Sequence, residues 1–89
     1  DDVKKPKPDP EPYLLALNRL NLLPDECIAI EDSIYGVISA KTAGINVIAV
    51  LTGVNNRREF RGLGVYKIFK NLKEVLKFFK ENLEIEENK

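Results

Sequence analysis

Hydrophobic positions divide the chain into alternating helical and extended segments. Apolar residues recur at helical spacing in the segment that ends before Asn21 and Pro24, which predicts an amphipathic helix. We place its N-cap at Asp9 and Pro10 in its first turn, where proline is well tolerated. The apolar side of this helix consists of Tyr13, Leu14, Ala16, Leu17 and Leu20.

A short apolar run lies between two groups of polar residues. The run Cys27–Ile30 is typical of a strand that is buried on both faces in a parallel sheet. Ser33 is suited to cap a helix that follows this strand, and Gly44 is suited to end it. The helix offers small residues for close packing on a sheet, namely Gly36, Val37, Ala40 and Ala43.

Two more apolar runs and a final helix complete the pattern. Val47–Leu51 and, more weakly, Val65–Phe69 predict strands. Asn71 and Glu74 have the spacing of a capping box, which predicts the start of a helix. The buried stripe of this helix is predicted to be Leu72, Val75, Leu76, Phe79 and Leu83. Residues 84–89 are nearly all charged or amide, so we expect this end to fray.

The order helix, strand, helix, strand, loop, strand, helix predicts an α/β fold. Its sheet is parallel, has about three strands, is flanked by helices and is connected by right-handed crossovers. Three strands are few for a sheet of this kind. We therefore expect the strand at 27–30 to have an unpaired apolar edge, along which a missing N-terminal half or another chain would pair.

Composition excludes several classes of function. Fourteen basic residues balance fourteen acidic ones, so the chain lacks the uniform positive field that binding to nucleic acid or to an anionic membrane requires. The absence of histidine excludes a Ser-His-Asp triad and a zinc site with imidazole ligands. The single cysteine, Cys27, cannot form an internal disulfide, which favours the cytoplasm.

We expect no targeting segment and no membrane span in these residues. No segment approaches the roughly 20 apolar residues of a membrane span, and the charged, proline-rich start differs from a signal peptide. The chain has no methionine and begins with Asp1. We therefore expect a processed product, a proteolytic fragment or a truncated chain.

Glu31 and Asp32 are the strongest candidates for chemistry. They follow the strand at 27–30, and ligands bind beyond the carboxyl ends of strands in open α/β sheets. One carboxylate could bind a hard divalent cation directly while the other acts through water, as magnesium accepts. Alternatively, Asp32 or Ser33 only caps the next helix.

Cations near the N-terminus and after the second strand are weaker candidates. Lys7 lies among prolines that restrict the backbone, so its ammonium could serve as a fixed cation for a phosphoryl group. The alternative is a solvated lysine in a proline-rich linker. Similarly, the polar segment 55–58 could reach an anionic substrate or could be solvated surface. That segment consists of Asn55, Asn56, Arg57 and Arg58.

Four motifs in order carry a resemblance to a known family. They are Lys7-Pro8-Asp9-Pro10, Pro24-Asp25-Glu26-Cys27, Ile30-Glu31-Asp32-Ser33 and Ala43-Gly44. Together they resemble the haloacid dehalogenase superfamily, in its phosphoglycolate phosphatase and β-phosphoglucomutase-like branch, over residues 3 to about 50. The resemblance implies a Rossmann-like core, of which residues 1–89 would be the C-terminal portion.

The resemblance also implies roles for individual residues. Lys7 would be catalytic and would bind phosphate, because the family's lysine balances charge on the nucleophilic aspartate and the phosphoryl group. Asp32 would be a catalytic Mg²⁺ ligand, Glu31 would assist metal binding, and Ser33 would bind phosphate. Pro6 departs from the glycine that usually precedes this lysine. The implied substrate is a small phosphorylated metabolite, and the implied reaction passes through a phosphoaspartate, as in a phosphatase or phosphomutase.

The family's Asp-x-Asp nucleophile motif, its second-motif serine or threonine and its cap domain are not found in these residues. We therefore expect the 89-residue chain to support the reaction but to show no phosphatase turnover alone. The alternative is a non-catalytic interaction or binding module that retains half of the fold. A receiver domain is excluded because Lys7 precedes Asp32. A nucleotide-binding Rossmann unit is excluded because residues 31–36 lack a glycine-rich turn.

Overall fold

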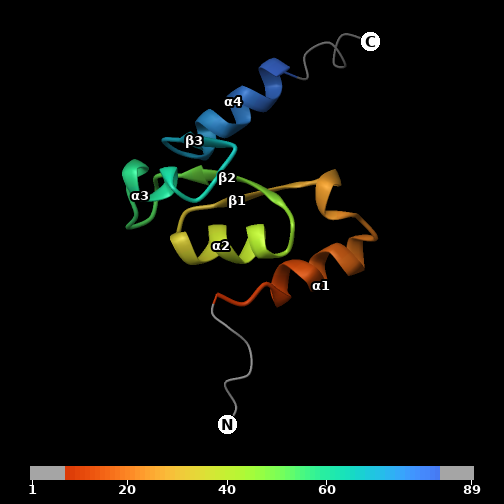
Figure 1. The fold of residues 1–89 in the computed structure, drawn as a ribbon. Coiled ribbons are helices and arrows are strands. Elements are labelled where there is room, and N and C mark those ends of the chain that lie inside the picture. Colours follow the sequence, from red (N-terminus) through yellow and green to blue (C-terminus); the bar gives the residue numbers. More distant parts are fainter. Residues whose placement is uncertain (1–7, 83–89) are drawn as a thin grey trace.

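The computed structural model describes residues 8–82 as a small α/β unit (Figure 1). Its strands are β1 (Ile28–Glu31), β2 (Asn46–Val50) and β3 (Lys67–Phe69). Its helices are α1 (Glu11–Leu20), α2 (Ile34–Thr42), α3 (Arg57–Arg61) and α4 (Leu72–Asn82), with a 3₁₀ turn at Pro24–Glu26. The strand order is β1-β2-β3 and both pairs are parallel, so the predicted fold class is confirmed.

The first helix begins slightly later than its sequence indicates. The Asp9 carboxylate accepts a hydrogen bond from the Glu11 N–H at 2.9 Å, but the N-cap is Pro10. The prediction of Asp9 as N-cap is therefore wrong by one position. The end of the helix is as predicted, because Asn21 adopts the left-handed conformation with φ 57° and closes the last turn.

β1 differs from its prediction in position and in burial. It spans Ile28–Glu31 instead of 27–30, and only Ala29 is buried. Ile28 and Ile30 are 42% and 40% exposed, so the strand is not buried on both faces. The physical reason is that β1 is an end strand, and the buried cluster of Ile48, Val50 and Val75 on its second face includes no residue of β1. Within the part of the chain that the structure describes, β1 pairs with β2 alone, in agreement with the expected unpaired edge.

The two faces of the sheet are covered unequally. One face packs against α1, α2 and α3, and its core contains the larger set of buried side chains (Figure 1). These residues are Leu17, Ala29, Val37, Ala40, Ala43, Ile45, Val47, Ala49 and Phe60. Among residues 8–82, the opposite face packs against α4 alone, through Ile48, Val50 and Val75. The site described below is therefore supported mainly from the α1–α3 face.

The segment after β2 contains a helix that sequence reasoning missed. We predicted a loop, but residues 57–61 form α3, which Asn56 and Glu59 begin with a capping box. The Glu59 N–H donates to Asn56 Oδ1 at 3.0 Å, and the Asn56 N–H donates to Glu59 Oε1 at 2.8 Å. Phe60 is fully buried and anchors this short helix in the core.

The last helix begins as predicted but exposes part of its predicted stripe. The Glu74 N–H donates to Asn71 Oδ1 at 3.0 Å. Val75 is buried, whereas Leu72 and Leu76 are 54% and 67% exposed, because α4 covers only the side of the sheet near β2 and β3. Leu83 and residues 84–89 lie outside the described residues. No helix in residues 8–82 has the length and apolar character of a membrane span.

Candidate functional site

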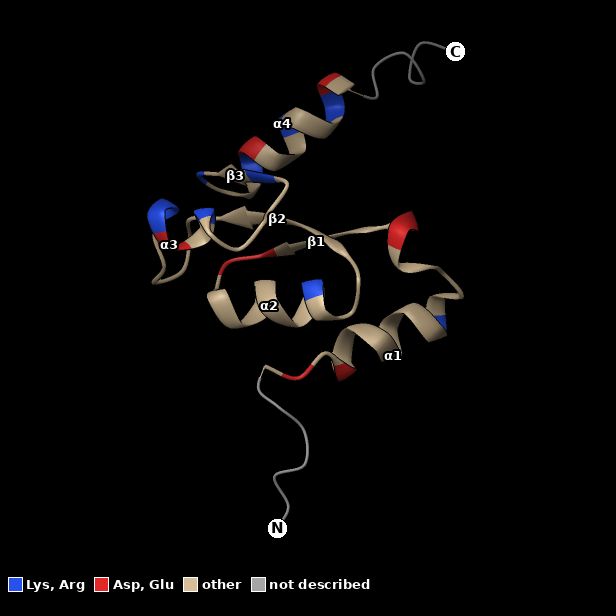
Figure 2. Ribbon diagram, viewed as in Figure 1, with Lys and Arg blue, Asp and Glu red and all other residues tan. Residues whose placement is uncertain are grey.

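The acidic pair lies at the carboxyl end of β1, as predicted. Glu31 is the last residue of the strand, and Asp32 follows it directly. Figure 2 shows this acidic segment between β1 and the first turn of α2. We refer to residues 31–34, from the last residue of β1 to the first residue of α2, as the Asp32 turn. This position is where open α/β sheets bind ligands.

Ser33 is the N-cap of α2. Its Oγ accepts a hydrogen bond from the Gly36 N–H at 3.0 Å, and its carbonyl accepts one from the Val37 N–H. Capping occupies one lone pair of the hydroxyl and leaves its proton able to donate. The capping role is therefore observed for Ser33, not for Asp32, while binding of phosphate by Ser33 stays a prediction.

Asp32 is left available for a ligand. Among the described residues, its carboxylate has no hydrogen-bond partner, because Ser33 caps the helix. The backbone around it is tightly enclosed. A Cβ at Gly53 would lie 2.5 Å from the Asp32 carbonyl oxygen and 3.2 Å from its Cγ, so only glycine allows this approach. Both the backbone and the carboxylate of Asp32 thus lie close to the backbone of Gly53.

Glu31 is a half-buried carboxylate packed on α2. A Cβ at Gly36 would collide with the Glu31 carboxylate, so this glycine makes room for the acid. Burial raises the pKa of Glu31, and the negative charge of Asp32 raises it further. A bound cation would offset both costs of ionisation. The pair therefore has the electrostatic character of a cation site.

A loop from the neighbouring strand contacts the Asp32 turn. We refer to residues 51–56 as the β2–α3 loop. The Ile34 N–H donates to Asn55 Oδ1 at 3.0 Å, and Asn55 Nδ2 donates to Glu59 Oε1 at 3.2 Å. The hydrogen bond from the Asn56 N–H and that from the Asn55 side chain lower the pKa of Glu59. The network joins the carboxyl ends of β1 and β2.

Sequence reasoning named some of these residues but missed their connections. It placed Glu31 and Asp32 at the end of a strand and Ser33 at a helix N-cap, where the structure has them, and it treated Asn55 only as part of a polar segment. The capping-box spacing of Asn56 and Glu59 was a signal for α3. No local signal connects Asn55 to Ile34, because these residues are 21 positions apart. Lys7 lies outside the described residues, so its convergence with Asp32 stays a prediction.

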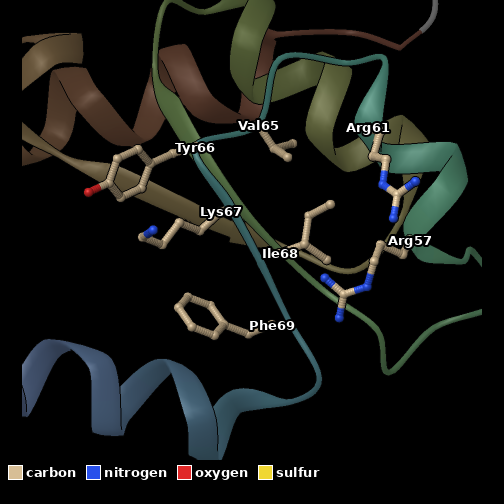
Figure 3. A pocket seen from close by; sticks show the side chains of 7 residues that line it. All are labelled: Arg57, Arg61, Val65, Tyr66, Lys67, Ile68 and Phe69. Atoms are coloured by element: carbon tan, nitrogen blue, oxygen red, sulfur yellow. The ribbon is translucent and has the colours of Figure 1, made fainter.

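Two arginines after β2 lie along β3. Arg57 and Arg61 line an open cleft of about 430 Å³ along β3, together with residues 65–69 (Figure 3). Both guanidinium groups lie on the side of β3 that carries Ile68, and Lys67 projects to the other side, with its Nζ 5.4 Å from the Tyr66 ring centre. Binding of an anionic substrate by the segment 55–58 therefore stays a prediction.

The donor set fits part of a site for a hard cation. Carboxylate oxygens are the preferred protein ligands of Mg²⁺, which is often bound by one or two carboxylates and retains several waters. Glu31 and Asp32 provide such a pair. Within residues 8–82 there is no group of three or more His, Cys, Asp or Glu side chains that could hold a metal ion. A complete site would take its other donors from water, from a phosphorylated ligand or from residues elsewhere.

A parallel α/β sheet with carboxylates at the carboxyl end of a strand belongs to the Rossmann-like class of folds. A sequence profile of haloacid dehalogenase-like hydrolases matches residues 1–50. The chain belongs to the haloacid dehalogenase-like hydrolase family. This confirms the resemblance seen in the motifs.

Individual relatives agree with this assignment. A phosphorylated carbohydrates phosphatase from Thermotoga maritima is 42% identical over 84 residues, which are 93% of this chain and 38% of the relative. A T. maritima structure assigned as a β-phosphoglucomutase has a TM-score of 0.74 and 40% identity, and covers 91% of this chain and 38% of its own. A hydrolase of the family from Deinococcus radiodurans R1, with bound phosphate and sodium, has a TM-score of 0.76 and 28% identity, with coverages of 84% and 34%.

The relatives share one class of chemistry. The relatives include phosphatases, and phosphatases of this family generally depend on a metal ion. The T. maritima enzyme acts on phosphorylated carbohydrates, as its name states. The chain spans about 38% of the length of that relative.

Proposed function

We propose that this chain is the C-terminal portion of a haloacid dehalogenase-like core in a magnesium-dependent phosphohydrolase. The enzyme would be a phosphatase or phosphomutase that acts on a small phosphorylated metabolite. The supporting observation is the acidic pair at the end of β1. Asp32 has a carboxylate without a hydrogen-bond partner among the described residues, and burial and Asp32 raise the pKa of the adjacent Glu31.

Each proposed site residue has a distinct task in this reaction. Asp32 would bind the ion directly, and Glu31 would bind it directly or through water. The bound ion would neutralise charge on the phosphoryl group. Lys7 would place a second positive charge near that group, and Ser33 could donate its hydroxyl proton to a phosphate oxygen while it caps α2.

The chemical step would begin with an aspartate that these residues do not include. That aspartate would attack phosphorus and displace the leaving group, which forms a phosphoaspartate. Water or a second hydroxyl would then attack phosphorus and release the aspartate. The nucleophile strand and the cap would come from outside residues 1–89. This proposal agrees with the open edge of β1 and with the share of the relatives that the chain covers.

We also propose that the parent protein resides in the cytoplasm. Cys27 is a free, partly buried thiol, and the described residues contain no membrane-spanning helix. A reducing compartment suits such a thiol. Fractionation of the source cells, with the parent protein detected by an antibody, tests this location; recovery in a secreted or membrane fraction contradicts it.

Phosphate release tests the catalytic proposal. We expect no Mg²⁺-dependent release from p-nitrophenyl phosphate or sugar phosphates by the purified 89-residue chain, because it lacks the nucleophile. We expect release by the protein that the complete reading frame encodes, and loss of that activity in its Asp32→Ala variant. Turnover by the chain that survives Asp32→Ala contradicts the proposal, as does a complete protein whose activity does not change on this substitution.

A second candidate function rests on the exposed edge of the sheet. Ile28 and Ile30 lie on end strand β1 and are about two-fifths exposed, which favours a non-catalytic module that binds another segment or chain there. Analytical ultracentrifugation tests whether this surface drives self-association. Reversible dimerisation that Ile30→Lys abolishes supports it, and a monodisperse monomer at high concentration contradicts it. An Asp-x-Asp motif in the upstream reading frame would favour the catalytic proposal instead.

A further inference from the structure

Residues outside β1 and α2 hold the Asp32 turn in place. On its N-terminal side, Glu31 pairs with Ala49 in the sheet. On its C-terminal side, the Ile34 N–H donates to Asn55 Oδ1 at 3.0 Å. The first N–H groups of a helix have no partner within the helix, so a side chain that accepts from one of them also fixes where the helix begins. Asn55 therefore constrains the Asp32 turn, which carries Asp32, the proposed metal ligand.

The orientation of the Asn55 amide is determined by its second partner. Asn55 Nδ2 donates to Glu59 Oε1 at 3.2 Å, and a carboxylate can only accept. If the amide rotated by half a turn, its oxygen would face the carboxylate and its NH₂ group would face the Ile34 N–H. Both contacts would be lost. Glu59 is held in turn by the Asn56 N–H at 2.8 Å, so the arrangement extends to the first turn of α3.

A second contact connects the same two segments. The backbone of Gly53 lies so close to Asp32 that an added Cβ would be 2.5 Å from its carbonyl oxygen and 3.3 Å from Oδ2. The β2–α3 loop thus contacts the Asp32 turn at Gly53 and at Asn55. A change that releases Asn55 removes one of these two contacts and leaves the contact at Gly53.

We propose that Asn55, oriented by Glu59, is a positioning residue that holds the Asp32 turn in the geometry required for binding a divalent cation. The assignment of the cation rests on the proposed function. Asn55 does not touch the ion; it acts through the backbone at Ile34. Groups that orient metal ligands typically change metal affinity by about 10-fold to 100-fold when removed. We expect the lower end of this range, because Gly53 still supports the turn.

Two variants of the 89-residue chain separate this role from general stability. Asn55→Ala removes the contact with Ile34. Asn56→Ala is the matched control, because it removes the neighbouring side chain that caps α3 and leaves the contact between Asn55 and Ile34. The first measurement, without metal, is amide hydrogen exchange of Ile34 by NMR. The second is a titration with Mn²⁺ that follows line broadening at the amides of Ser33 and Gly53.

The proposal predicts a specific pattern. Asn55→Ala accelerates exchange of the Ile34 amide and weakens Mn²⁺ binding by about tenfold, whereas Asn56→Ala changes both by less than about twofold. If Asn55→Ala does not fold, Glu59→Gln provides the second variant, with an effect in the same direction because the amide of Asn55 loses its charged partner. Equal effects of the Asn55 and Asn56 variants on the two measurements overturn the proposal.

Failure of the proposed function gives a different result. In that case the wild-type chain and Asp32→Ala bind Mn²⁺ equally weakly. The exchange of the Ile34 amide in Asn55→Ala then still decides whether Asn55 holds the turn. Faster exchange supports the structural part of the proposal and removes its metal part, and unchanged exchange overturns both.

Discussion

The two loops at the carboxyl ends of β1 and β2 each involve a glutamate, and the pKa values of these glutamates are shifted in opposite directions. In the Asp32 turn, burial and the charge of Asp32 raise the pKa of Glu31. Next to the β2–α3 loop, hydrogen bonds from Asn56 and Asn55 lower the pKa of Glu59. Ionisation of the glutamate is therefore disfavoured at the end of β1 and favoured next to the β2–α3 loop.

This difference distinguishes the acidic residues that are proposed to bind a cation from the loop that holds them in place. Burial and the charge of Asp32 disfavour ionisation of Glu31 in the folded state, so neighbouring residues must hold the turn in place. The β2–α3 loop does so through Gly53 and Asn55, and α3 anchors that loop through buried Phe60. The predictions below test this separation by changing the support and then the charge.

Phe60→Ala should have the largest effect. Phe60 is fully buried and connects α3 to the core under the β2–α3 loop, so its truncation leaves a cavity. We expect the free energy of unfolding to fall by about 3–5 kcal/mol, measured by chemical denaturation. Val54→Ala is the control, since this side chain is 96% exposed, and it should change stability by less than about 0.5 kcal/mol. Similar effects of the two variants would show that α3 is not an anchor.

Gly53→Ala should have an intermediate effect. The new Cβ would lie 2.5 Å from the Asp32 carbonyl oxygen, so the loop or the turn must shift. We expect a loss of about 1–3 kcal/mol in the free energy of unfolding and weaker Mn²⁺ binding. Gly62→Ala is matched, because a Cβ there meets nothing within 4 Å. A Gly53→Ala chain as stable as Gly62→Ala would contradict the close contact between the two loops.

Exchanging each glutamate for glutamine should have the smallest effect, with opposite signs. A raised pKa means that ionisation of Glu31 destabilises the fold, and this cost grows as the pH rises from about 4.5 through the raised pKa. Glu31→Gln should therefore stabilise the metal-free chain at pH 7 by about 0.5 kcal/mol, a small value because the side chain is only half-buried. The gain should vanish below pH 4.5, the ordinary pKa of the side chain.

Glu59→Gln should act in the other direction. Ionised Glu59 stabilises the fold above its ordinary pKa of 4.5, and this contribution disappears as the pH falls through its lowered pKa. The variant should therefore be less stable than the wild type at pH 7, and the difference should shrink in acid. Thermal denaturation across this pH range measures both curves. Curves of the same sign would contradict the comparison of the two loops.

Local patterns in the sequence were sufficient for much of the fold and for the charged part of the site. The Ser33 cap, the end of α2 before Gly44 and the three strands all follow from residues that are adjacent or one helical turn apart. The acids at the end of β1 were found for the same reason, since the end of an apolar run can be read directly from the sequence.

Features that depend on distant partners could not be read in this way. The hydrogen bond between Asn55 and Ile34 joins two loops that only the sheet brings together. Leu72 and Leu76 have the spacing of a buried stripe, but the sheet beneath α4 is too narrow to cover them. The exposure of Ile28 and Ile30 likewise depends on what pairs with β1 and covers its second face, not on the strand itself.

The central claim is that Asp32 and Lys7 converge on one pocket for metal and phosphate. Paramagnetic relaxation by Mn²⁺ tests it directly, with the side-chain protons of Lys7 compared with those of Lys41, whose ammonium binds the Gly64 carbonyl. The account predicts that Lys7 relaxes much faster than Lys41 and that Asp32→Ala removes the difference. Equal relaxation of the two lysines, while Ser33 still broadens, would contradict it.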